Sequence, residues 1–107
     1  MKYNKLVRDK IPEIIAADGR VAICEILSIG AYLELLDAKL NEELAGYQVD
    51  KSIDELADLL EVIYAVVNAH GYSLEQLEQI RAEKAEKRGA FEKKIFLKEV
   101  VEHKNTV

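Results

Sequence analysis

The chain has 107 residues, of which 50% are hydrophobic and 33% are charged, and its formal net charge is −5. This length fits one domain, and the composition is that of a globular protein rather than of a disordered one. The negative charge argues against non-specific binding to nucleic acid and to an anionic membrane surface. The longest apolar run, Val62 to Val67, is far too short to span a bilayer.

The N-terminal sequence and the cysteine content indicate the compartment. The first residues, Met1 to Lys5, are followed by no apolar stretch, so we expect no signal peptide and a cytoplasmic protein. The single cysteine, Cys24, excludes an intrachain disulfide, and no zinc-ligand spacing is present. Because Cys24 has apolar neighbours, we expect it to be a small buried side chain.

Two short elements are predicted near the ends of the chain. A short helix is expected over residues 10–17, with Asp9 as its N-cap and Pro12 in its first turn. Residues 20–27 are rich in Val, Ile and Leu and are bounded by turn signals, which predicts a short strand. Residues 91–97 are its candidate partner.

Three longer helices are predicted, from Ile29 to about Tyr47, from Ile53 to about His70, and from Ser73 to about Arg88. Three such helices are one short of a closed bundle. We therefore expect an all-α helical bundle completed by dimerisation, with a minor short strand pair beside it. The predicted domain covers residues 1–102, and residues 103–107 are a C-terminal tail. The apolar positions that define one face of the first two helices are Ile29, Tyr32, Leu33, Leu36, Leu40, Leu44 and Tyr47, and then Leu56, Leu59, Leu60, Ile63, Val66 and Val67.

Three carboxylates lie at the margins of these apolar faces when residues are placed at about 100° per residue. They are Glu43 on the first long helix and Glu55 and Asp58 on the second. Carboxylates at one helix–helix margin repel one another unless a cation lies between them, and Mg²⁺ prefers oxygen ligands. Lys39 is a candidate i,i+4 partner of Glu43. The other acids of these helices are expected to face solvent: Glu42, Asp54 and Glu61.

Ordinary helical chemistry is the alternative explanation for these acids. Glu55 is the third residue after Ser52, so the pair forms a capping-box pattern that by itself accounts for a glutamate there. Asp58 would then belong to a solvated acidic face of the kind that many surface helices carry.

The same residues lie within a longer pattern. Glu42-Glu43 on one helix and Glu55-Leu-Ala-Asp58 on the next resemble the signature of the MazG-like nucleotide pyrophosphohydrolases, which is Glu-x-x-Glu, a spacer, and Glu-x-x-Asp. The opening run from Tyr3 to Ile15 is similar to the start of a subgroup described as phosphoribosyl-ATP pyrophosphohydrolase-like. The run from Lys87 to Leu97 is similar to the C-terminal end of that subgroup.

This resemblance implies an all-α fold assembled as a homodimer or homotetramer, with Mg²⁺ as cofactor. It implies cleavage of a nucleoside triphosphate or related nucleotide between the α and β phosphates, which gives a monophosphate and pyrophosphate. By position, Glu43, Glu55 and Asp58 take the metal-binding and catalytic roles. The fourth position of the signature is Gly46 instead of glutamate. The alternatives are a catalytically degenerate module that binds nucleotide or a protein partner, and a purely structural helical hairpin that binds no Mg²⁺.

Cations for the phosphates are expected at the end of the last helix. Lys84, Lys87 and Arg88 share that end at i, i+3 and i+4 spacing, and we predict that they contact the leaving pyrophosphate. The alternative is a solvated last turn whose positive charge suits the helix dipole. Secondary candidates lie in the N-terminal segment: Lys5, Arg8 and Lys10.

Overall fold

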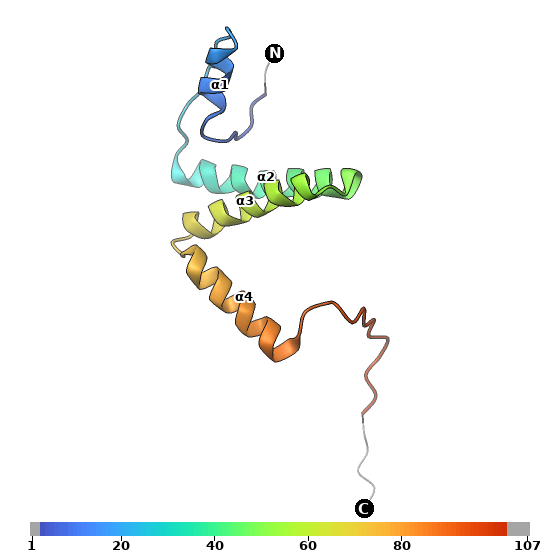
Figure 1. The fold of residues 1–107 in the computed structure, drawn as a ribbon. Coiled ribbons are helices and arrows are strands. Elements are labelled where there is room, and N and C mark those ends of the chain that lie inside the picture. Colours follow the sequence, from blue (N-terminus) through green and yellow to red (C-terminus); the bar gives the residue numbers. More distant parts are fainter. Residues whose placement is uncertain (1–2, 103–107) are drawn as a thin grey trace, which may run out of the picture. The chain divides into compact units, whose positions relative to one another are not determined.

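The computed structural model describes residues 3–102. Within this range the chain forms helices α1 (Ile11–Ala17), α2 (Ile29–Asp50), α3 (Ile53–Ala69) and α4 (Leu74–Arg88), as Figure 1 shows. No strand occurs among these residues, so the prediction of an all-α fold is confirmed.

The chain divides into two compact units, one ending at Leu74 and the other beginning at Glu75. The first unit holds α1, α2 and α3, and nearly all of α4 belongs to the second. The single domain expected over residues 1–102 depends on how these units join, so it stays a prediction. The tail expected over residues 103–107 lies outside the described residues.

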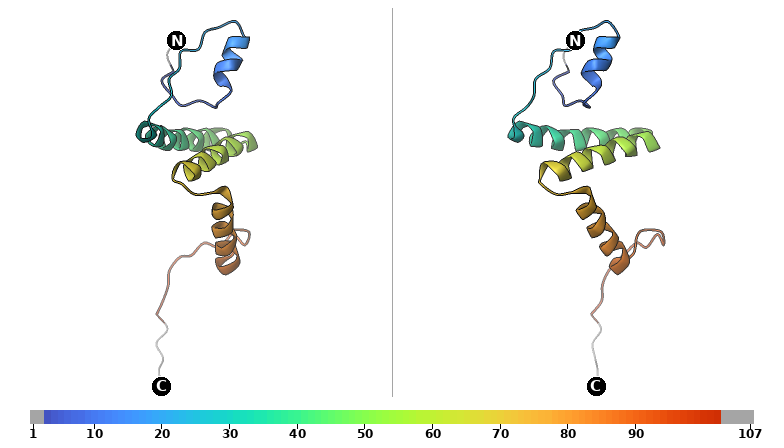
Figure 2. Two further views of the ribbon diagram at one scale, coloured as in Figure 1. Left: turned by 90° about the vertical axis from the view of Figure 1, so that its left-hand side faces the viewer. Right: turned by 60° about the vertical axis from the view of Figure 1, so that its left-hand side comes forward.

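Helices α2 and α3 form an antiparallel hairpin (Figures 1 and 2). Among the described helices of the first unit, they are the only two that pack against each other. Lys51 ends α2 in the left-handed conformation, with φ of 56°, and its N–H donates to the Tyr47 carbonyl at 2.7 Å. Ser52 then caps α3, because its Oγ accepts a hydrogen bond from the Glu55 N–H at 3.2 Å. A two-residue link therefore reverses the chain and sets the two helices side by side.

The helix boundaries follow the predicted start and stop signals, with two main differences. Helix α2 continues to Asp50, beyond the expected end near Tyr47, because the left-handed residue that stops it is Lys51. The N-cap of α1 is Lys10, without a side-chain hydrogen bond, so the prediction of Asp9 as cap was wrong. The turn before α1 is closed instead by the backbone, with the Ile11 N–H donating to the Arg8 carbonyl at 3.1 Å.

The predicted strand pair is absent from the described residues. Residues 20–27 and 91–97 have no regular secondary structure apart from turns and bends. Their Val, Ile and Phe residues favour a strand locally, but a strand forms only where a neighbouring strand pairs with its backbone. Ile23 and Ile26 are each 98% exposed, and Cys24 is exposed rather than buried as expected.

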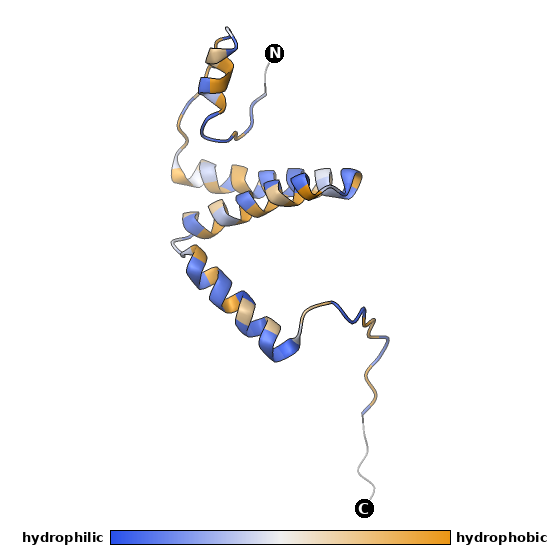
Figure 3. Cartoon of the chain, viewed as in Figure 1, coloured by the Kyte–Doolittle hydropathy of each residue, from blue (hydrophilic) through white to orange (hydrophobic). Residues whose placement is uncertain are grey.

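The hydrophobic core of the described chain is very small. Only Leu36, in the first half of α2, is buried among residues 3–102. Leu56 and Leu60 were expected on the buried face of α3, but they are 40% and 45% exposed. Figure 3 shows apolar residues along both α2 and α3, whereas α4 is mostly hydrophilic. One copy of the hairpin thus leaves much of its apolar face uncovered. No helix in the described range is long and apolar enough to cross a membrane.

Candidate metal centre

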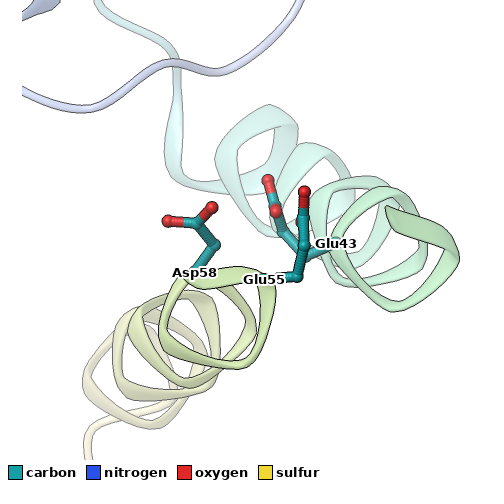
Figure 4. A group of neighbouring side chains, drawn as sticks. All are labelled: Glu43, Glu55 and Asp58. Carbon is teal, nitrogen blue, oxygen red and sulfur yellow. The ribbon is translucent and has the colours of Figure 1, made fainter. Parts of the chain in front are cut away.

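Three carboxylates meet where α2 and α3 come together. Glu43 lies in the last two turns of α2, and Glu55 and Asp58 lie in the first two turns of α3. Because the hairpin is antiparallel, these turns face each other across the short link. Each residue offers a carboxylate oxygen, and these three atoms all lie within 4.8 Å of one another. Figure 4 shows the three side chains on one side of the helix pair. We call these three residues the acidic cluster.

The acidic cluster is formed by the three acids selected from the sequence, and all three are partly buried. Their roles as ligands stay a prediction. Glu42 and Glu61, expected to face solvent, are exposed. Asp50, the last residue of α2, is not part of the group of three.

The side chain of Glu55 reaches across to the backbone of α2. A Cβ atom at position 46 would lie 2.6 Å from Oε2 of Glu55 and 3.0 Å from its Cδ. Gly46 has no Cβ, so the Glu55 carboxylate lies over the α2 backbone. In this position it sits beside Glu43, which is also on α2.

Cations from two parts of the chain contact the acids. Arg8 places Nη2 2.7 Å from Oδ1 of Asp58, a contact between residues fifty positions apart. Lys39 lies 3.6 Å from Oε1 of Glu43, which confirms the expected i,i+4 pair, and 2.9 Å from Oε2 of Glu42. Lys5 also pairs with Glu42, at 3.2 Å. Arg8 and Lys39 therefore neutralise part of the negative charge of the acidic cluster.

Glu55 is the member of the acidic cluster whose charge neither Arg8 nor Lys39 offsets. Partial burial raises the pKa of its carboxyl above the ordinary value, and the negative charges of Glu43, Asp50 and Asp58 raise it further. No ion pair of Glu55 is found among the described residues. In the absence of a cation, Glu55 thus favours its protonated form more than an isolated glutamate does.

Glu42 shows the opposite behaviour beside the acidic cluster. A hydrogen bond from Lys39 lowers the pKa of its carboxyl, partial burial opposes this effect, and Lys5 lowers the pKa further. Glu42 is therefore already supplied with positive charge, while Glu55 is not. An added cation would therefore be stabilised more by binding beside Glu55 than by binding beside Glu42.

The geometry fits a small divalent cation. Oxygen ligands of Mg²⁺ lie at about 2.1 Å, so two ligands on opposite sides of the ion are about 4.2 Å apart. Neighbouring ligands in an octahedral shell are only about 3 Å apart, so the carboxylate oxygens of the acidic cluster, which lie within 4.8 Å of one another, would move closer together around one ion. Three protein ligands leave positions for water and for phosphate oxygens, which Mg²⁺ commonly retains.

The predicted phosphate contacts lie on another part of the chain. Lys84, Lys87 and Arg88 are exposed on the last two turns of α4. They belong to the unit that begins at Glu75, whereas the acidic cluster belongs to the unit that ends at Leu74, so their role stays a prediction. The structure instead brings Arg8 to Asp58. The sequence placed Arg8 only among secondary candidates, because no local pattern reveals a contact over this separation.

Comparison with known proteins gives one partial match. No family model and no solved structure matches the chain. An uncharacterized protein from Mycolicibacterium smegmatis is 54% identical to it over 41 residues. The matched part is 38% of this chain and 42% of that protein, so the similarity spans less than half of either. It carries no statement of activity.

Proposed function

We propose that this protein is a Mg²⁺-dependent nucleotide pyrophosphohydrolase of the cytoplasm. Its substrate is a nucleoside triphosphate or a related nucleotide, cleaved between the α and β phosphates into a monophosphate and pyrophosphate. The observation that carries the proposal is the acidic cluster, in which three carboxylates from two helices meet within 4.8 Å. The resemblance of residues 42–58 to the MazG-like signature supplies the reaction.

The acidic cluster supplies the metal ligands of this reaction. Glu43, Glu55 and Asp58 would hold the cation, because each offers a carboxylate oxygen and these three atoms lie within 4.8 Å of one another. Bound Mg²⁺ would neutralise the phosphates and polarise the phosphoryl oxygen under attack. Glu55 is also the candidate general base, because it has no ion pair among the described residues and its second carboxylate oxygen would be available to accept a proton from water. Lys84, Lys87 and Arg88 are the proposed contacts of the leaving pyrophosphate.

A second copy of the chain is part of the proposal. The hairpin buries only Leu36 among the described residues and leaves Leu44, Leu56 and Leu60 at least 40% exposed. Two such hairpins would cover each other's apolar faces and complete a bundle. We therefore propose a homodimer or homotetramer.

A non-catalytic module that binds nucleotide or a protein partner is the second candidate. Gly46 favours it, because the acidic cluster lacks the fourth carboxylate of the family signature. Arg8 and Lys39 favour it too, since they already offset part of the charge that a metal would neutralise.

Pyrophosphate release from a panel of ribo- and deoxyribonucleoside triphosphates tests the proposal. We expect release with Mg²⁺ and none with a chelator. The Glu55→Gln variant is expected to lose about 10²-fold or more in rate, because it removes the general base. Glu61→Gln is the matched control, since Glu61 is an exposed acid on the same helix outside the acidic cluster.

The outcomes separate the candidates. No release from any nucleotide by a protein with intact helices would exclude the enzyme and favour the binding module. Absence of Mg²⁺ binding as well would leave only a structural helical hairpin.

A further inference from the structure

The N-terminal segment supplies the acidic cluster with one exposed cation. Arg8 contacts Asp58 at 2.7 Å, and the two side chains are 58% and 42% exposed. Arg8 lies just before the turn that leads into α1, outside any helix. Its guanidinium is thus carried by an irregular stretch of chain and is accessible to solvent.

The other nearby cations differ from Arg8 in their partners. Lys39 is only 19% exposed and is shared between two acids of its own helix, Glu42 and Glu43. Lys5 is exposed, but it pairs with Glu42, outside the acidic cluster. Arg8 is the one exposed cation in the described residues whose ion pair is with a member of the acidic cluster.

Arg8 and a divalent cation compete for the same carboxylate. A metal bound to Asp58 would lie within about 5 Å of a guanidinium that donates to the same group, and the two positive charges would repel. An exposed ion pair contributes at most about fivefold to an equilibrium constant, so a divalent cation displaces it readily.

The displaced guanidinium then has a new partner. A polyphosphate arrives at the same place with the metal, and it presents oxygen atoms in the geometry that the planar arginine fork binds in pairs. We propose that Arg8 is a phosphate-binding residue that pairs with Asp58 only until metal and nucleotide bind. This inference rests on the proposed function, because it takes the acidic cluster as the metal site.

Calorimetric titration of the full chain tests the exchange with two probes. The first is Mn²⁺ alone, and the second is the Mg²⁺ complex of inorganic tripolyphosphate, which has the phosphate chain without a base. For Arg8→Gln we expect Mn²⁺ to bind about two- to fivefold more tightly, because the competing cation is gone. We expect the tripolyphosphate complex to bind about tenfold more weakly, because charge-assisted hydrogen bonds to phosphate are lost.

Two further variants identify the cause. Arg8→Lys keeps the charge without the fork, so its Mn²⁺ affinity should stay near wild type while its tripolyphosphate affinity falls. Arg20→Gln removes one positive charge from an exposed pair with Asp18 at 3.1 Å, which involves no member of the acidic cluster, and should change neither affinity. Circular dichroism and thermal melting confirm that each variant is folded.

The opposite signs of the two effects make the test decisive. If Arg8→Gln weakens the binding of both probes, Arg8 merely positions Asp58. If it changes the binding of neither probe, the ion pair has no role. Each of these results overturns the inference without contradicting the proposed function. If the wild-type chain binds neither Mn²⁺ nor the tripolyphosphate complex, the proposed function fails and the inference fails with it.

Discussion

The carboxylate of Glu55 occupies the space that any side chain at Gly46 would need, with Oε2 2.6 Å from the position of a Cβ atom there. Gly46 is also the position at which the family signature has its fourth acid. The missing acid and the placement of Glu55 are therefore linked. The glycine that replaces the acid lets the Glu55 carboxylate approach the backbone of α2 beside Glu43. Adding a carboxylate by Gly46→Glu would displace Glu55, so that variant tests a rearranged site rather than a restored one.

The first prediction concerns Gly46→Ala. The methyl group should push the Glu55 carboxylate aside and weaken Mn²⁺ binding several-fold. The folded state should gain up to about 1 kcal/mol, because alanine favours the helix interior over glycine and the displaced atoms are the end of a flexible side chain. Calorimetric titration with Mn²⁺ and thermal melting measure the two effects.

Gly30→Ala is the matched control for this substitution. Gly30 lies in the first turn of α2, and nothing lies within 4 Å of a Cβ built there. Its Mn²⁺ affinity should equal that of the wild type. Undiminished Mn²⁺ binding by Gly46→Ala would show that the position of Glu55 over α2 does not matter to the metal.

The second prediction concerns pH in the absence of metal. The pKa of Glu55 is raised above its ordinary value of 4.5, so the folded state holds more protons than the unfolded state between these two values. Stability from this group is therefore greatest at acid pH and falls as the pH rises through the raised pKa. Thermal midpoints in chelator at about pH 5 and about pH 7.5 should show this decline in the wild type and a smaller decline in Glu55→Gln.

A second group acts in the other direction below this range. The pKa of Glu42 is lowered, chiefly by Lys39, so its contribution to stability is present above 4.5 and is lost as the pH falls below that value. Glu42→Gln should accordingly flatten the acid limb of the stability profile and leave the decline toward neutral pH intact. An identical profile for the Glu55→Gln variant and the wild type would contradict the assignment of that decline to Glu55.

The third prediction concerns metal and stability. A cation that binds only the folded state at one hundred times its Kd stabilises the protein by about 2.7 kcal/mol. Mg²⁺ or Mn²⁺ should therefore raise the thermal midpoint of the wild type. Asp58→Asn should abolish most of the shift because it removes one of three ligands, whereas the exposed Glu61→Gln should retain it. A shift of equal size in both variants would place the metal elsewhere.

The fourth prediction concerns assembly. Leu56 and Leu60 lie on one face of α3 and are 40% and 45% exposed. If a second copy covers them, light scattering at micromolar concentration should give the mass of a dimer or tetramer, and Leu60→Glu should shift the mass toward the monomer. Ile23→Glu is the control, because Ile23 is exposed outside the helices. A wild-type monomer at that concentration would contradict the proposed oligomer.

The sequence by itself determined the helices and the choice of acids. Helix periodicity, the serine caps and the stop signals are local properties, so α2 and α3 begin where they were expected to begin, α4 begins one residue later than expected, and α3 and α4 end within a residue of the expected position. The same periodicity placed Glu43, Glu55 and Asp58 at the margins of two apolar faces. The antiparallel pairing of those faces then brings the three acids together.

Only the tertiary structure decided what surrounds these acids. The contact between Arg8 and Asp58 joins two segments that no local pattern relates, and the approach of Glu55 to Gly46 depends on how closely two helices pack. The predicted strand at residues 20–27 was wrong for the same reason, since β-propensity is local whereas strand pairing is not. Helical periodicity predicts which side chains share a face of a helix, and the tertiary structure determines which of their atoms come into contact.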